Sequence, residues 1–251
     1  MKGLAILFQK ELREQLRTNR IIIVAGVFLL FGLTMPLMTK YLPEILEMSG
    51  VEMGPWFPLP TATQAMADYA SNIAQIGTLV IILIAMGAIS KERESGTAAL
   101  VLSKPVDYSA FVTAKFIVLG ITTVAGVILG GLACWVYTII LFPEMPTLGF
   151  LFLNMTLLLY LLLTIAITLF FSGIFRNQLV AGGLSLATII VFSIASGLPW
   201  VGKYLPGELI SWGNRLLSGE TGVAWEAVAV AFALIVLSLY LAWTRLRTKE
   251  I

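Results

Sequence analysis

The chain has 251 residues, of which 59% are hydrophobic and 12% are charged, and its formal net charge is +2. Soluble domains usually have about a quarter charged residues, so this composition excludes an ordinary soluble globular protein. The small net charge gives no support to nucleic-acid binding, and no nucleic-acid partner is expected. The absence of histidine, with Cys134 as the single cysteine, excludes an intrachain disulfide and the usual His/Cys zinc sites.

Six apolar runs of membrane-spanning length follow one another along the chain. A helix that rises 1.5 Å per residue needs about 20 residues to cross the hydrocarbon of a bilayer. The runs are apolar on every side, which favours helices over the alternating strands of an outer-membrane barrel. We therefore predict an all-α, polytopic membrane protein with one transmembrane domain over residues 1–251. The predicted spans are 21–38, 73–89, 116–142, 148–175, 179–198 and 223–243.

Residues 1–20 precede the first span and have a helical period. Leu4, Phe8, Leu12 and Leu16 follow at four-residue steps, and most of the charged residues lie elsewhere. This period predicts an amphipathic helix in the cytoplasmic interface that holds the entry angle of the first span. The alternative is a generic, positively charged flank. The first span is not expected to be a secretory signal peptide, because it lacks a small-x-small cleavage pattern.

Residues 39–72 form the segment between the first two spans, which we expect on the outer side. This segment contains four prolines and the aromatic residues Trp56, Phe57 and Tyr69. We predict a short helix at LPEILEM and a proline-stiffened aromatic turn at PWFPLP on the outer interface. A solvated loop is the alternative.

Residues 90–115 form the longest segment that we expect on the cytoplasmic side. It begins with a charged run from Lys91 to Glu94, turns at Ser95 and Gly96, and continues with a short apolar stretch that stops at Pro105. We interpret it as a short helix that lies across the cytoplasmic face and seats in a groove of a soluble partner. An ordinary connecting loop is the alternative.

Small residues follow one face of the third span, and hydroxyl groups follow one face of the fourth. The small face indicates close helix packing, within one subunit or, as second choice, between subunits. Hydroxyls are easily buried because they bond to carbonyls of their own helix, so packing is favoured for the second face as well. Its functional alternative is the mildly polar wall of a translocation path. The small face is Thr122, Gly126, Gly130 and Cys134, and the candidate pathway residues are Thr156, Tyr160, Thr164, Thr168 and Ser172.

Residues 199–221 precede the sixth span and interleave apolar and charged side chains around Pro206 and Gly207. We interpret them as two short interfacial or re-entrant helices on the outer side. Charges inside the spans are essentially absent, and Glu226 is near enough to the outer end of the sixth span to reach the interface. This pattern argues against an ion-coupled carrier or an intramembrane enzyme.

Cations show which ends of the spans face the cytoplasm. With a cytoplasmic N-terminus, only Lys40, Lys203 and Arg215 of the 16 Lys and Arg residues fall outside. This asymmetry predicts that both termini are cytoplasmic. The cations on the inner side are Lys2, Lys10, Arg13, Arg17, Arg20, Lys91, Arg93, Lys104, Lys115, Arg176, Arg245, Arg247 and Lys249.

The segment after the second span resembles that of the ABC-2 type exporter permeases, which has the pattern E-x-E-x-G-T-x-x-x-L-x-x-x-P with a later lysine. The topology resembles the same family over the whole chain, most closely the small permeases of Gram-positive bacteria. The matching residues are Glu92, Glu94, Gly96, Thr97, Val101 or Leu102, Pro105 and Lys115.

This resemblance implies a permease in the bacterial plasma membrane that is not itself an enzyme. It implies two permease subunits, as a homodimer or a heterodimer, and a cytoplasmic ABC ATPase that docks on the coupling segment 90–115. The chain has no G-x-x-x-x-G-K-[ST] motif, so ATP and Mg²⁺ would bind to the partner ATPase and this chain would hold no cofactor. The uncharged spans suggest an amphipathic or lipid-like cargo. The alternative function is a membrane-bound regulator or scaffold that holds a cytoplasmic signalling partner.

Overall fold

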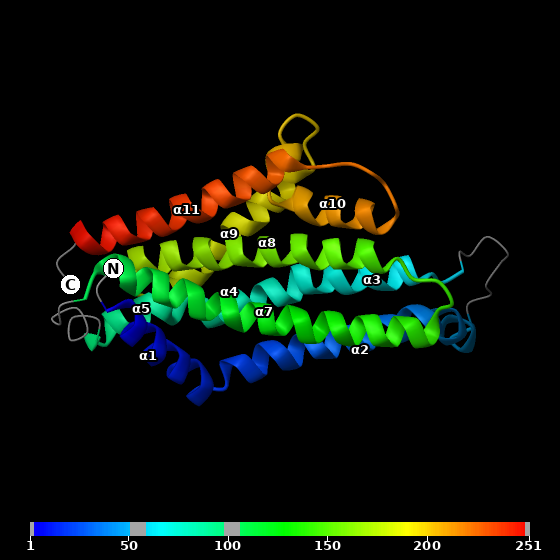
Figure 1. The fold of residues 1–251 in the computed structure, drawn as a ribbon, viewed down its shortest axis with the longest axis horizontal. Helices are drawn as coiled ribbons and strands as arrows, with labels where there is room; N and C mark the ends of the chain where they lie inside the picture. Colours follow the sequence, from blue (N-terminus) through cyan, green and yellow to red (C-terminus); the bar gives the residue numbers. More distant parts are fainter. Residues whose placement is uncertain (1–2, 51–58, 98–105, 249–251) are drawn as a thin grey trace.

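The computed structural model describes residues 3–50, 59–97 and 106–248. All secondary-structure elements in these ranges are helices, and no strand occurs in them (Figure 1). Six helices in this part of the chain are long and apolar enough to cross a membrane. The predicted all-α fold with six spans is therefore confirmed. The spanning helices are Arg20–Met48, Ala62–Glu94, Tyr108–Leu141, Thr147–Ile174, Gln178–Ser196 and Trp225–Thr248.

The first spanning helix, α2 (Arg20–Met48), extends ten residues beyond the predicted span 21–38. The separate short helix that we expected at LPEILEM is wrong, because these residues are the last turns of α2. Pro36 and Pro43 lie inside the helix, where each removes one hydrogen bond without ending the element. The predicted aromatic turn falls mainly on residues 51–58, which lie outside the described ranges.

The second spanning helix has four consecutive parts: α3 (Ala62–Asn72), a π turn η1 (Ile73–Gly77), α4 (Thr78–Ala85) and α5 (Gly87–Glu94). It begins before the predicted span 73–89 because the polar residues of α3 continue the helix. It also continues past Ser90 into the coupling segment 90–115, which we expected outside the spans. The apolar stretch that we interpreted as a short helix across the cytoplasmic face lies mostly outside the described residues. Hydropathy marks the apolar part of such a helix and misses its polar extensions.

The helix α8 (Thr147–Ile174) is the centre of the bundle. In its most apolar stretch of 18 residues, 61% of the residues are buried. The corresponding share is 22–28% in α2, α9 (Gln178–Ser196) and α11 (Trp225–Thr248). It packs against α4, α9, α11, α7 (Tyr108–Leu141) and α10 (Gly207–Leu217). Four of the other spanning helices thus lie around it, whereas α2 packs mainly against α7. The helices α2, α9 and α11 leave wide apolar faces exposed.

The predicted small face of the third span is buried between α7 and α2. A Cβ atom on Gly130 would stand 2.6 Å from the carbonyl oxygen of Phe28, and one on Gly126 would stand 2.7 Å from a methyl group of Val24. Only glycine lets the two backbones approach this closely. The small residues therefore serve packing within one chain.

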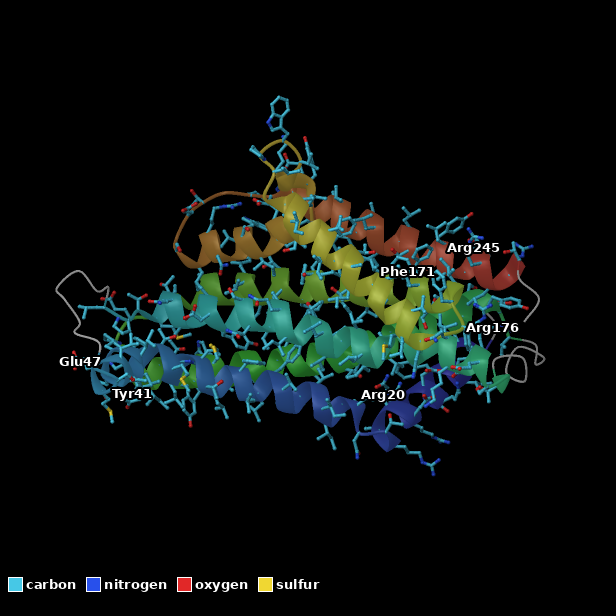
Figure 2. All side chains as sticks on the ribbon, turned by 180° about the vertical axis from the view of Figure 1, so that it is seen from behind. Arg20, Tyr41, Glu47, Phe171, Arg176 and Arg245 are labelled. Atoms are coloured by element: carbon cyan, nitrogen blue, oxygen red, sulfur yellow. The ribbon has the colours of Figure 1, made fainter. Side chains whose placement is uncertain are left out.

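Two ends of the bundle are easy to distinguish in Figure 1. We call the end with α1 (Leu4–Arg17), α5 and the last turn of α11 the terminal end, and the opposite end the distal end. Figure 2 shows Arg176 and Arg245 at the terminal end, and Tyr41 and Glu47 at the distal end. The predicted orientation requires such an arrangement, and the assignment of the terminal end to the cytoplasm stays a prediction.

Two short helices, η2 (Gly202–Tyr204) and α10, occupy the segment before α11. The helix α10 lies along the first half of α8 (Figure 1), where Gly213 contacts Thr156 and Leu153. Two short helices were expected here and are present. Their re-entrant or interfacial placement in a bilayer stays a prediction.

Candidate functional site

A cluster of charged side chains joins three helices at the terminal end. The ammonium group of Lys115 on α7 donates to Oε1 of Glu11 on α1 at 2.8 Å and to Oε1 of Glu92 on α5 at 3.0 Å. The Lys115 side chain is 1% exposed, and those of Glu11 and Glu92 are 8% and 13% exposed. Buried charges at such distances hold each other in place, because separating them leaves a charge without a partner.

Lys10 completes this group, which we call the terminal cluster: Lys10, Glu11, Glu92 and Lys115. Its ammonium donates to Oε1 of Glu92 and to Oε1 of Glu11. Burial by itself would lower the pKa of Lys10, but the hydrogen bond with Glu92 and the charges of both carboxylates outweigh burial and raise its pKa above 10.5. Two ammonium groups thus share the same two carboxylate oxygens, and two basic side chains stand against two acidic ones.

The carboxylates of Glu11, Glu14 and Glu92 also come close enough together to face one metal ion. The ammonium groups of Lys10 and Lys115 already lie against Glu11 and Glu92. We therefore interpret the group as an ion-pair cluster rather than a metal site.

The helix α1 packs on the bundle with the ridge next to its predicted apolar face, whose residues Leu4, Phe8 and Leu12 are half-buried. Its buried residues are Leu7, Glu11 and Gln15, whereas Leu16 of the predicted apolar face is 58% exposed. Glu11 lies on the same ridge as Leu7 and meets Lys115 on α7, which supplies the charge that compensates its burial. The amphipathic helix is present, but the side that packs on the protein is partly polar.

A short turn sets the direction of α1 relative to α2. Asn19 adopts a left-handed conformation with φ of 55°, which asparagine tolerates better than most residues. The two helices consequently meet at an angle, and Arg20 lies at their junction (Figures 1 and 2). This angle brings Lys10 and Glu11 beside α5 and α7.

Ser172 of the predicted hydroxyl series links α8 to α5. Its Oγ accepts hydrogen bonds from the backbone N–H groups of Ile89 (3.0 Å) and Ser90 (2.9 Å), and it donates to the carbonyl of Met86 at 2.7 Å. The regular helix is interrupted at Met86, where a side chain inserts into the hydrogen-bond ladder. Arg93 adds a second link, because its guanidinium donates to the carbonyl of Gly173 near the end of α8.

The residues of the predicted coupling segment divide into two groups. Glu92 is in the terminal cluster, whereas Glu94, Gly96 and Thr97 are exposed just beyond it. Gly96 has φ of 72°, a left-handed conformation that favours glycine after the end of a helix. Pro105, like Val101 and Leu102, lies outside the described residues.

The remaining hydroxyl series on α8 is mostly packed within the protein. Thr164 and Thr168 are fully buried and donate to the carbonyls of Tyr160 and Thr164 in their own helix. Thr156 donates to the carbonyl of Leu153. Tyr160 differs from the other four residues, since it also lines a cavity.

That cavity, which we call the distal cleft, lies between the second spanning helix, α8, α9 and α10 and has a volume of about 650 Å³. None of its lining residues, all within the described ranges, carries a charge. The lining residues are Ser71, Ala74, Gln75, Thr78, Leu79, Tyr160, Leu186, Ile189, Ile190, Phe192, Ser193, Ser196, Gly197, Gly207, Ile210 and Ser211.

Sequence reasoning missed two parts of this arrangement. Lys115 was noticed only as a motif residue, and its pairing with Glu11 depends on a contact between elements 104 residues apart. Gln75 interrupts the apolar run of the second span and was overlooked. An amide inside a span is a visible signal, because a polar side chain there is costly to bury without a partner.

Comparison with known proteins identifies relatives of the whole chain. Residues 5–208 match the model of a family described as "ABC-2 family transporter protein". A transmembrane protein of Bacillus subtilis (strain 168), YxlG, described as uncharacterized, is 26% identical over 258 residues, which cover 100% of this chain and 99% of the relative. The similarity thus extends over the spans, the terminal cluster and the distal cleft.

Proposed function

The chain belongs to the ABC-2 family of transporter proteins, and from this premise we propose that it is the permease subunit of an ATP-driven exporter. Family membership gives it a role in membrane transport, and its six apolar helices make it a multi-pass membrane protein. The cargo, the partner ATPase, the export direction and the bacterial plasma membrane as location belong to the proposal.

The observation that carries this proposal is the terminal cluster. Glu92 on α5 and Lys115 on α7 lie near the two ends of the coupling segment and bond to each other. Lys10 and Glu11 tie them to α1. Ser172 then ties α5 to the central helix α8. A force applied at the coupling segment would consequently move four elements together, as a permease driven by a separate motor requires.

The ATPase is proposed to be a separate polypeptide that docks on the coupling segment and binds ATP and Mg²⁺ itself. This chain has no phosphate-binding loop of the Walker type. The exposed positions of Glu94, Gly96 and Thr97 support a docking role for them, because an exposed side chain can contact a partner without rearrangement.

A second permease subunit is the other proposed partner. The faces of α2, α9 and α11 are mostly exposed, and the distal cleft presents hydroxyl and amide groups that lipid tails solvate poorly. A second copy of this chain, or a similar chain, placed over the cleft would cover these groups and enclose a path between the two subunits. Lipid would cover the remaining apolar faces.

To test whether the chain is part of an exporter, the tagged chain is purified from its native membrane and the proteins bound to it are identified. ATP hydrolysis is then measured in lipid vesicles. We expect a stoichiometric ATPase. The variant Glu92→Gln should lower transport and lipid-stimulated ATP hydrolysis together, because it removes a charge from the terminal cluster. Glu47→Gln is the matched control, since Glu47 is exposed at the distal end.

The result also separates the exporter from a scaffold. A signalling protein recovered without any ATPase, and held equally well by the wild type and by Glu92→Gln, would contradict the exporter and favour the regulatory function. An ATPase whose activity is the same in both chains would contradict the coupling role of Glu92 alone.

A further inference from the structure

We propose that the distal cleft is a binding site for an uncharged amphiphile, whose hydroxyl- or amide-bearing head group lies toward the distal end and whose apolar tail points toward the middle of the bundle. This assignment deepens the proposed transport function, on which the identification of the ligand as cargo rests. The geometry of the cleft and the chemistry of its walls carry the inference.

Contacts at the deeper end of the cleft show how α9 runs relative to the second spanning helix. Gly182 of α9 packs against Met86, and Gln178 packs against Gly87 at the start of α5. The first residues of α9 thus lie beside the end of the second spanning helix. The two helices run antiparallel, so the last residues of α9 lie at the level of α3 and η1.

The distal end of the cleft carries most of its polar side chains, beside the apolar Ala74, Phe192 and Ile210. Ser71 and Gln75 reach it from α3 and η1, Ser193 and Ser196 reach it from the end of α9, and Ser211 reaches it from α10. Four hydroxyls and one carboxamide from three directions offer both donors and acceptors of hydrogen bonds. A head group with hydroxyls or amides would therefore find partners on every side.

The deeper end of the cleft is largely apolar. It is lined by Leu79 of α4 and by Leu186, Ile189 and Ile190 of α9. Tyr160 and Thr78 contribute the polar atoms of this part, and both are almost completely buried. The cleft is thus richer in polar side chains at one end and richer in apolar side chains at the other, as an amphiphile is. Its volume of about 650 Å³ lies within the range of small-molecule sites.

The lining also selects against charge. Glu208 and Arg215 are charged residues of α10, but they pair with each other and neither lines the cleft. An ionic head group would lose its hydration without gaining a counter-charge, which is unfavourable. A neutral head group gives up less and regains hydrogen bonds with the serines.

Gln75 supplies an independent reason for a polar ligand. Its side chain is exposed in a π turn of a spanning helix, and π turns are frequent at functional sites. A carboxamide that faces hydrocarbon without a hydrogen-bond partner is unfavourable. The head group of an amphiphile in the cleft would provide that partner.

The test is photolabelling of the chain in vesicles, together with the proteins that co-purify with it. Three probes carry the same diazirine-bearing acyl chains and differ in the head group: a diacylglycerol, a phosphatidylglycerol and a trimethylammonium diester. We expect the neutral diacylglycerol to label the lining residues of α4 and α9 about tenfold more than either charged probe. Equal labelling by the three probes, or preference for a charged probe, would overturn the assignment.

Two adjacent positions of α9 provide matched variants. Ser193→Trp fills the cleft and should reduce labelling to background. Ile194→Trp places the same ring on a residue that is 72% exposed and does not line the cleft, so labelling should be unchanged. Protection of the buried thiol of Cys134 from a thiol reagent shows whether each variant is folded. Equal loss in two folded variants would contradict the location.

Gln75→Glu tests the charge selection without filling the cleft. The new carboxylate should shift the preference from the neutral to the trimethylammonium probe. An unchanged preference in the folded variant would show that the cleft does not select by charge and would overturn that part of the proposal.

Labelling requires no turnover, so it remains measurable if the chain proves not to be an exporter. Loss of selectivity with intact ATPase coupling would overturn the ligand assignment alone. Addition of ATP then separates two sources of the same chemistry. Labelling that changes during hydrolysis supports an exported amphiphile, whereas constant labelling supports a resident lipid of the bilayer.

Discussion

The terminal cluster and the distal cleft lie along the same second spanning helix but use opposite chemistry. In the terminal cluster, two ammonium groups and two carboxylates touch one another, and Lys115 keeps only 1% of its side chain exposed. The distal cleft holds about 650 Å³ of space within walls that carry no charge among the described residues. Ion pairs hold the helices that carry them at fixed distances from one another. Hydroxyl groups around an open space can form hydrogen bonds with different ligands. The two regions thus differ in the way that the two proposals require, with a rigid cluster for the transfer of force and an adaptable cleft for a ligand.

The largest effect on stability is expected from Lys115→Met, which removes the buried ammonium group at the centre of the terminal cluster and so tests whether this region is rigid. Glu11 and Glu92 would then share only Lys10, and we expect a loss of about 3 kcal/mol or more of unfolding free energy. The reactivity of buried Cys134 with a thiol reagent during heating measures this loss. Lys91→Met, at an exposed position of α5, is the control. Equal stability of the two variants would contradict a structural role for the ion pairs.

A smaller effect is expected from Ser172→Ala, which removes the link between α8 and α5. The N–H groups of Ile89 and Ser90 would lose their acceptor, at a cost of about 1–3 kcal/mol. Ser185→Ala is the matched control, because that buried hydroxyl bonds only to its own helix, at Ala181. The same thermal assay should show a clear shift for the first variant and a shift near zero for the second.

In the distal cleft we expect activity and stability to respond separately. Gln75→Leu removes an amide that faces the membrane region, so stability should change by less than about 0.5 kcal/mol or increase. ATP-driven transport by the co-purified complex should nevertheless fall, since a hydrogen-bonding group of the cleft is lost. Gln64→Leu, exposed on α3 outside the cleft, should leave both properties unchanged. A parallel loss of stability and transport in Gln75→Leu would remove the distinction between the two regions.

A small effect on stability is expected from Lys10→Met, at the exposed edge of the terminal cluster. Its side chain is 37% exposed, so we expect at most about 1 kcal/mol. Because the pKa of Lys10 is raised in the folded chain, its contribution is complete below 10.5 and is lost as pH rises through the folded-state pKa. Melting curves of the wild type and the variant should therefore converge at high pH. Curves that stay parallel would show that Lys10 contributes through packing.

The six helices could be predicted because each apolar run is long enough to cross a bilayer. Their ends could not, since α2 continues through Pro43 and the second spanning helix begins within the polar sequence of α3. The helical register within a membrane depends on packing against neighbours, which a hydropathy profile does not contain.

The candidate site was predictable in its motif and not in its geometry. Glu92 was found from a family pattern, but its partners are Lys115 on α7 and Lys10 on α1, 82 residues away in the sequence. Lys10 reaches Glu92 only through the angle between α1 and α2. The hydroxyl series on α8 was visible as a period. Its division into packed threonines, a linking Ser172 and a cavity-lining Tyr160 depends on which helix lies opposite each residue.

The π turn of the second spanning helix acts as a correction of register. Buried residues there follow at a constant interval of four, and in an α-helix such a series drifts about 40° around the axis with every step. A π turn closes i→i+5 hydrogen bonds, so each residue in it advances the helix by a smaller angle. The turn at Ile73–Gly77 therefore winds the series back toward the bundle before it can rotate into the lipid. The series is Tyr69, Ile73, Gly77, Ile81, Ala85 and Ile89.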